Sequence, residues 1–252
     1  MASDTPSPVR VLLLTKSRGY RHDCIPTMVS AFDSFPVVVK HTEDSSQLSS
    51  LSDYDVIALG HNTGEYLTDD ESISLRDFVE NGGGVVGIHA ATSGMKEDAR
   101  YTKILGEVFN GHPPPQWIAL EIENPKHYIN GYESLPGMDS APASAPTCTI
   151  SLKSGVEKQF LWYDELYSFR SHPRLAEGRT VLLSARDEGD FTTESPGFPL
   201  SWCQTVGAGR VYYTALGHFD EAYQDSWFLG NLRRGIIWAA KRDAYKENPI
   251  EA

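Results

Sequence analysis

Residues 78–92, FVENGGGVVGIHAAT, contain a helix end, a buried strand and a tight turn in succession. Gly82 to Gly84 supply the left-handed stop of a helix. The apolar run Val85–Ile88 is typical of a strand covered on both faces. His89 follows at the point where the chain must turn, a place where such elbows often present a nucleophilic serine or cysteine. A histidine there is a poor covalent nucleophile but a good proton carrier and metal ligand.

Buried strands and amphipathic helices alternate through the first 110 residues. Strands are expected at 9–16, 36–43, 55–62 and 85–90, and helices at 25–35 and 68–81. The second helix has its own start signal, because Thr68 and Glu71 have the spacing of a capping box. Alternation of this type requires right-handed crossovers and a parallel sheet, so we predict an α/β fold.

The second half of the chain is less regular. Strands are expected at 116–124 and 180–188, a hairpin around Gly207 to Gly209 at 199–217, and a core-facing helix at 226–242. Residues 134–147 are rich in Pro, Ala and Ser and predict a surface loop or insertion. No linker or repeat divides the sequence, so residues 1–252 are expected to form a single domain.

Composition restricts the class of partner. The formal net charge is −12, which argues against nucleic acid and anionic membranes. No secretory signal precedes the first apolar run, and no apolar segment is long enough to cross a membrane. The three cysteines are scattered without a CxxC pair, so neither a disulfide scaffold nor a zinc ribbon is indicated. We expect a soluble cytoplasmic protein that binds a small molecule; the oligomeric state is open.

Polar side chains follow the expected strands at the edge where parallel sheets bind ligands. The candidates for this rim are Arg21, His22, Asn62, Thr63, His89, Thr92, His112 and His218. Four of the eight histidines of the chain are among them. A single histidine at a strand end is more often a hydrogen-bonded structural residue. The prediction of a functional site therefore depends on several of these histidines meeting at one place.

The segment WYDELY, residues 162–167, combines three aromatic rings with two carboxylates. Such a combination suits sugar recognition, since a pyranose presents an apolar face and a rim of hydroxyl groups. Trp162 and Tyr163 are candidate sugar contacts, and Glu165 is the best candidate for a general base or metal ligand. The alternative is a core strand whose carboxylates face solvent.

Several motifs together resemble the ThuA-like family of trehalose utilisation proteins. They include GYRHD, YDVIALGHNTGEYL, FVENGGGVVGIHAAT, WYDELYSFRSHPR and PLSWCQTVGAGRVYYTALGH. The resemblance implies a class I glutamine amidotransferase-like fold, a flavodoxin-like three-layer sandwich with a mainly parallel central sheet and helices on both faces. Residues 87–91 resemble the G-x-C-x-G elbow of the amidotransferases with His89 in place of the cysteine. His218 resembles their distal histidine, with Asp220 where they have glutamate, and glutaminase activity is not expected.

The resemblance also implies a disaccharide, a glycoside or its 3-keto derivative as substrate. Elimination, hydrolysis or isomerisation would use acid–base chemistry by His22, His89, His218 and Glu165, with Arg21 holding an anionic intermediate. Alternatively, His22, His89 and His218 would hold a divalent metal; no other cofactor is expected. Two other functions stay open: a binding or regulatory module without catalysis, and a related enzyme recruited to a non-sugar metabolite.

Overall fold

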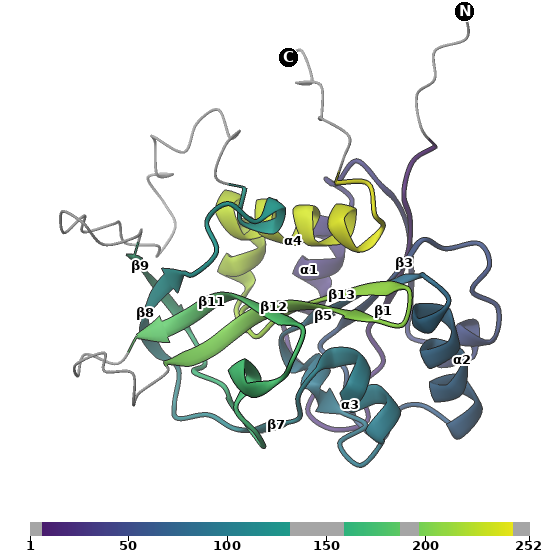
Figure 1. Ribbon diagram of the computed structural model, residues 1–252, viewed down its shortest axis with the longest axis horizontal. Coiled ribbons are helices and arrows are strands. Elements are labelled where there is room, and N and C mark those ends of the chain that lie inside the picture. Colours follow the sequence, from purple (N-terminus) through teal and green to yellow (C-terminus); the bar gives the residue numbers. More distant parts are fainter. Residues whose placement is uncertain (1–6, 132–158, 187–196, 244–252) are drawn as a thin grey trace, which may run out of the picture.

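A single nine-stranded sheet forms the centre of the computed structural model, which describes residues 7–131, 159–186 and 197–243 (Figure 1). The strand order is β2-β1-β3-β5-β13-β12-β11-β8-β9. The strands are β1 (Arg10–Leu14), β2 (Val38–Thr42), β3 (Val56–Gly60), β5 (Gly84–Ile88), β8 (Gln116–Ile122), β9 (Gln159–Asp164), β11 (Arg179–Arg186), β12 (Phe198–Val206) and β13 (Gly209–Thr214). The loop expected at 134–147 lies outside the described residues.

The sheet has a parallel part and an antiparallel part. Strands β2, β1, β3, β5 and β13 are parallel to their neighbours within this group. Beyond β13, each of β12, β11, β8 and β9 is antiparallel to the strand before it in the sheet. Strand β9 therefore points in the same direction as β13, and its carboxyl end lies at the same edge as those of the parallel strands.

Helices cover both faces of the sheet. Helices α1 (Ile25–Phe32) and α4 (Ser226–Ala239) lie on one face, and α2 (Asp69–Glu80) and α3 (Ala99–Leu105) on the other (Figure 1). The central strands β1, β3 and β5 are apolar apart from Arg10 at the start of β1, and β3 and β5 are buried along their whole length. Coverage on both faces explains these continuous apolar runs. The predicted α/β sandwich is confirmed.

Local signals in the sequence begin and end these elements as expected. Thr68 accepts a hydrogen bond from the backbone N–H of Glu71, whose carboxylate accepts one from the N–H of Thr68, so the capping box of α2 is formed. The predicted hairpin joins β12 to β13 through Gly207, which has a φ of 59°. That left-handed backbone favours glycine.

Register places two histidines side by side at the carboxyl edge. Gly60 of β3 is paired with Ile88 of β5, so His61 and His89 follow at equivalent positions. Both have a left-handed backbone, with φ of 55° and 49°. The loops after these two histidines pair with each other as β4 (Thr63–Gly64) and β6 (Ser93–Gly94). A second short pairing joins β7 (Phe109–Gly111), after α3, to β10 (Ser168–Phe169), after β9.

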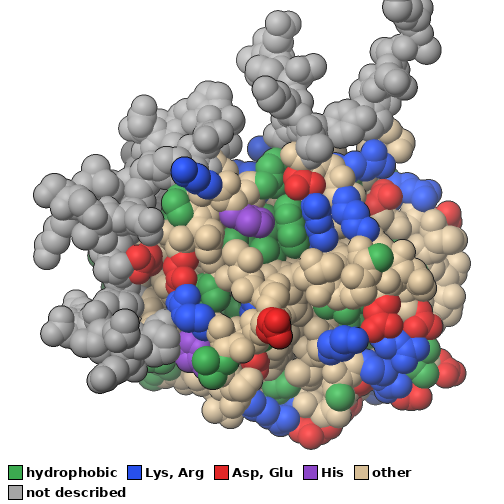
Figure 2. All heavy atoms as spheres, in the orientation of Figure 1, with side chains coloured by type: hydrophobic (Ala, Val, Ile, Leu, Met, Phe, Trp, Pro, Cys, Tyr) green, Lys and Arg blue, Asp and Glu red, His purple; other side chains and the backbone are tan. Residues whose placement is uncertain are grey.

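Charges of both signs are interspersed on the face of the molecule seen in Figure 2, over α2 and α3 in particular. This part of the surface has no extended basic field of the kind that binds a phosphate backbone. In the described part of the chain, no helix is long and apolar enough to span a bilayer.

Candidate functional site

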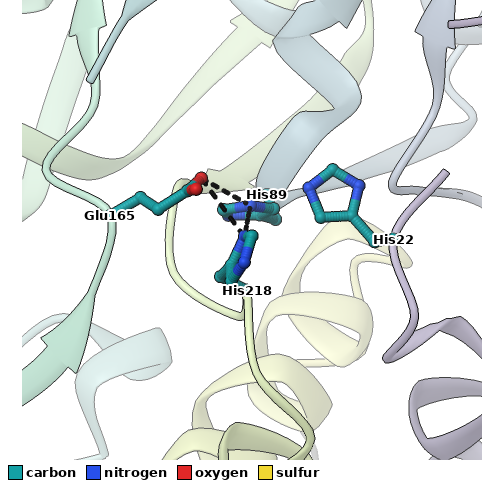
Figure 3. Close-up of side chains that lie close together, drawn as sticks. All are labelled: His22, His89, Glu165 and His218. Atoms are coloured by element: carbon teal, nitrogen blue, oxygen red, sulfur yellow. Dashed lines mark hydrogen bonds and ion pairs between the residues drawn. The ribbon is translucent and has the colours of Figure 1, made fainter. Parts of the chain in front are cut away.

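Four side chains converge at the carboxyl edge of the sheet: His22, His89, Glu165 and His218 (Figure 3). They come from the segments after β1, β5, β9 and β13, which are far apart in the sequence. One potential metal-ligand atom from each lies within 4.8 Å of those of the other three. Three of the side chains are buried and His218 is half-buried, so the cluster is largely shielded from bulk water.

His89 is held on a strained turn. It directly follows β5 and begins a short 3-10 helix, η2 (His89–Thr92), with a left-handed φ of 49°. A non-glycine residue in that conformation needs support from its surroundings. Tyr213 Oη donates to the carbonyl of His89 at 2.8 Å, and Tyr101 Oη donates to the carbonyl of Ala91 at 2.9 Å. These tyrosines fix the elbow and thereby the direction of the imidazole.

Hydrogen bonding sets the tautomer of His89. Its Nδ1 lies 2.6 Å from the carbonyl oxygen of Ala215, and because a carbonyl only accepts, Nδ1 carries the proton. The lone pair is then on Nε2, as in histidines that ligate metals. Tyr167 Oη lies 2.9 Å from this Nε2. Burial raises the pKa of Tyr167 well above its ordinary value, so the phenol is protonated and donates to His89.

Three atoms of Glu165, His218 and His89 lie so close together that a positive charge is needed between them. Glu165 Oε2 is 3.2 Å from His218 Nδ1 and 3.4 Å from His89 Nε2, and the two nitrogens are 3.3 Å apart. Burial alone would raise the pKa of Glu165, but the hydrogen bond from His218 and the charge on its ring outweigh it and hold that pKa well below its usual range. Burial opposes protonation of His218, yet Glu165 raises the pKa of that ring. One proton on His218, or one cation, satisfies all three atoms.

The same distances suit a metal ion. Ligands of a tetrahedral zinc ion, at about 2.0–2.1 Å from it, lie roughly 3.3–3.4 Å from one another. Imidazole and carboxylate together are a donor set for zinc and other first-row transition metals. His22 adds a third imidazole, with its ring centroid 4.9 Å from that of His89 and 5.2 Å from that of His218. Burial, with His89 and His218 nearby, lowers the pKa of His22 to about 3, so the ring is neutral and able to ligate.

A second layer of buried polar groups lies beneath His22. The ring centroid of His61 is 4.6 Å from that of His22, and its Nε2 is 2.7 Å from Tyr223 Oη. Cys24 Sγ lies 3.5 Å from the same Nε2, so the thiol contacts His61. Burial raises the pKa of Cys24 to about 12. Cys24 is therefore a neutral thiol here and lacks the properties of an activated nucleophile.

Asp164 joins the two loops that carry Glu165 and His218. Its side chain is fully buried and accepts four hydrogen bonds. Oδ1 accepts from the backbone N–H groups of Glu165 at 2.9 Å and His218 at 3.3 Å. Oδ2 accepts from Gly217 N–H at 2.8 Å and from Trp162 Nε1–H at 2.9 Å. One carboxylate thus sets the position of both loops relative to each other.

Two more of the predicted residues lie at the rim of the cluster. His112 Nε2 is 3.3 Å from Glu165 Oε1, and its Nδ1 is 2.8 Å from the carbonyl of Pro113. Tyr163 is partly exposed and contacts Phe219, the residue after His218. The segment 162–167 therefore contributes both a carboxylate and an exposed aromatic ring.

The other predicted substrate contacts are engaged within the protein. Arg21 pairs with Glu43 at 2.6 Å. Asn62 donates to the carbonyls of Leu14 and Lys16, and Thr63 donates to that of Tyr20, so both hold the segment after β1. Thr92 is buried against the hydroxyl of Tyr213. Trp162 is buried and packs on Trp227 and Phe228, away from Tyr163.

Three contributions were not predicted from the sequence. They are the hydrogen bond of Tyr167 to His89, the link that Asp164 makes between two loops, and the position of His61 next to the cluster. A signal existed for His61, since it follows β3 at the position where His89 follows β5. The hydrogen bonds of Tyr167 and Asp164 join segments far apart in the sequence and left no local pattern.

Comparisons with known proteins agree with this architecture. A ThuA-like protein structure from Bacteroides uniformis is similar over 94% of each chain, with a TM-score of 0.67 and 23% identity. One from Parabacteroides merdae is similar over 97% of this chain and 94% of its own, with a TM-score of 0.68 and 18% identity. The structure of a GMP synthase protein from Thermoplasma acidophilum is similar over 94% of this chain and 96% of its own, with a TM-score of 0.55 and 10% identity. At these identities the likeness concerns the fold.

Among curated protein sequences, none matches this chain. The ThuA family, described as trehalose utilisation, matches residues 10–239. That range contains the elbow, the cluster and every strand of the sheet. The chain belongs to the ThuA family.

Proposed function

We propose that this protein is an enzyme that acts on an uncharged disaccharide, glycoside or 3-keto derivative with the help of a divalent metal ion. His22, His89, Glu165 and His218 would hold the ion. The observation that carries the proposal is the convergence of two imidazole nitrogens, 3.3 Å apart, on one oxygen of a buried carboxylate at 3.2 and 3.4 Å. A bound ion would polarise a carbonyl or glycosidic oxygen as a Lewis acid.

The chain supplies two proton donors beside the cluster. The Tyr167 phenol is 2.9 Å from His89 Nε2, so it can donate its hydrogen bond to a substrate oxygen that binds beside His89 instead. Both ring nitrogens of His112 face acceptors, the carbonyl of Pro113 and the carboxylate of Glu165. An imidazole held in this way at the rim suits the role of general acid toward a leaving group.

The surroundings favour a neutral sugar over a charged metabolite. Tyr20 is 65% exposed and its ring lies edge-on to His22, with centroids 4.8 Å apart. Aromatic surface next to hydrogen-bonding groups suits a pyranose. Arg21 is paired with Glu43, while Asp23 and Asp220 are exposed near the cluster, so a phosphorylated sugar would meet repulsion. Glutaminase activity is not expected, because an imidazole occupies the elbow. The buried free thiols Cys24 and Cys203 suit a reducing, cytoplasmic location.

Metal analysis of protein purified without chelator tests this proposal. Wild type and the control His41→Ala, which removes an exposed histidine, should carry about one divalent ion per chain, and His89→Ala and Glu165→Gln should lose it. Turnover of 3-keto-trehalose should disappear with chelator and return with metal. Metal-free protein that turns over the substrate would refute the metal, leaving acid–base catalysis. Saturable sugar binding without turnover by the loaded protein would identify a binding module instead.

A further inference from the structure

A row of aromatic rings leads from the cluster onto the exposed surface of β8 and β9. The ring centroid of Phe219 is 4.5 Å from that of His218 and 5.3 Å from that of Tyr163. Tyr163 is in turn 5.4 Å from Trp117, its cross-strand partner. Each step is about the width of a hexopyranose ring, so the row extends the site by more than one such ring. We call Phe219, Tyr163 and Trp117 the aromatic row.

Burial distinguishes this row from ordinary core packing. Side chains alternate between the two faces of a strand. On β9, Trp162 points into the core, while Tyr163 is 39% exposed. On β8, Ile118 and Leu120 are buried, while Trp117 is 50% exposed. Neighbouring exposed aromatic side chains of this kind are typical of a binding surface, whereas scattered single ones are common on any protein.

The geometry points to a binding subsite for the second pyranose ring of an uncharged disaccharide. This inference rests on the proposed function, since the first ring would occupy the His/Glu cluster. The row begins with Phe219, whose ring contacts that of His218 in the cluster, which gives a disaccharide a continuous path from one ring position to the next. Sugar rings stack on aromatic faces through their C–H groups, and a tryptophan offers the largest such face. The row presents three rings and no charge, so a neutral second ring fits it.

A consequence is that the chain discriminates disaccharides from single sugars by Trp117. Binding of trehalose, 3-keto-trehalose, glucose and 3-keto-glucose is measured by tryptophan fluorescence and by calorimetry. Of the five tryptophans, Trp162 and Trp202 are buried, Trp227 and Trp238 are partly buried and pack on Trp162 and His127, and Trp117 is half-exposed in the row. The emission change should therefore arise mainly at Trp117. Trp117→Ala should weaken disaccharide binding by roughly five- to tenfold, the loss of one stacking contact. Binding of the single-ring sugars should be unchanged.

Matched variants make the result specific. Trp117→Phe keeps an aromatic face and should recover most of the affinity, and Tyr163→Ala tests the row at its next ring if Trp117→Ala fails to fold. Leu175→Ala removes an apolar side chain that is 83% exposed outside the row and should change nothing. Three results would each overturn the subsite. Wild type and Trp117→Ala could bind the disaccharides with equal affinity, neither disaccharide could bind saturably, or Trp117→Ala could lose affinity equally for single and double sugars.

Two further outcomes distinguish the subsite from a dimer contact and from the proposed function. If Trp117→Ala turns a wild-type dimer into a monomer with unchanged disaccharide affinity, the row is a contact between two copies of the chain and the subsite is overturned. If disaccharides bind in a Trp117-dependent way but no metal binds and nothing is turned over, the subsite stands and the proposed function fails.

Discussion

Replacing Asp164 by asparagine keeps the size of the side chain but removes its charge and one of its two acceptor oxygens. In the wild type the two oxygens accept four hydrogen bonds, from Glu165, Gly217, His218 and Trp162. In the variant, the amide NH₂ must face two of these N–H donors in a fully buried site. Donor would meet donor, whichever way the amide is turned.

The expected loss follows from the number of donors left without an acceptor. Each buried polar group without a partner costs about 1–3 kcal/mol, so two of them destabilise the fold by about 2–6 kcal/mol. The variant should still fold if the total stability is of the usual size, about 5–15 kcal/mol. Because Asp164 joins the loops of Glu165 and His218, metal affinity should also fall by about 10–100-fold, as when outer groups that orient metal ligands are removed.

Urea denaturation of the metal-free protein and competition titration with a chromophoric chelator measure the two effects. Asp220→Asn is the matched control, because it removes the same charge two residues from His218 but at an exposed position. The control should lie within about 0.5 kcal/mol of wild type. Wild-type stability in Asp164→Asn, or equal losses in both variants, would refute the reasoning.

Two other predictions follow from single hydrogen bonds. Tyr167→Phe removes the donor that occupies His89 Nε2, so metal affinity in the same titration should rise by about two- to tenfold; unchanged or weaker binding would contradict this. Asp98 caps α3 by accepting from the N–H of Arg100, and Asp98→Ala should cost about 1 kcal/mol at pH 7. Burial alone would raise the pKa of Asp98, but bonds from Arg100 and Ser72 hold it below 3.8. The stabilisation is therefore present above that pH and lost as the pH falls through the folded pKa. Urea denaturation at pH 7 and pH 3 should show the gap closing; a gap of constant size would disprove the assignment.

The parallel half of the fold could be predicted because its signals are local. The apolar run of β5, the glycines before it and the capping box at Thr68 each lie within a few residues of the element they define. The position of His89 at a strand end was predicted from the same short stretch. Histidines that follow neighbouring parallel strands then meet without further information, because those strands end at one edge.

The antiparallel half and its contribution to the site are not encoded locally. The sequence shows that Trp162 and Tyr163 face opposite ways on one strand, but only the packing of α4 decides that Trp162 is the buried one. Asn62 and Thr63 have the residue types of a binding loop, and the carbonyls of the segment after β1 engage them instead. Whether a polar group faces a ligand or a distant carbonyl depends on tertiary contacts.

Glu165 reaches the cluster because the number of strand reversals between β13 and β9 is even. The direction of the strands reverses four times between β13 and β9, and an even number of reversals restores the original direction. A chain that lost or gained one strand of this extension would deliver the residue after its edge strand to the opposite side of the sheet. The length of the connecting loops is free to change without moving the carboxylate, whereas the number of strands is not. Among chains of this architecture, the strand count of the extension should therefore vary in twos wherever the carboxylate is retained.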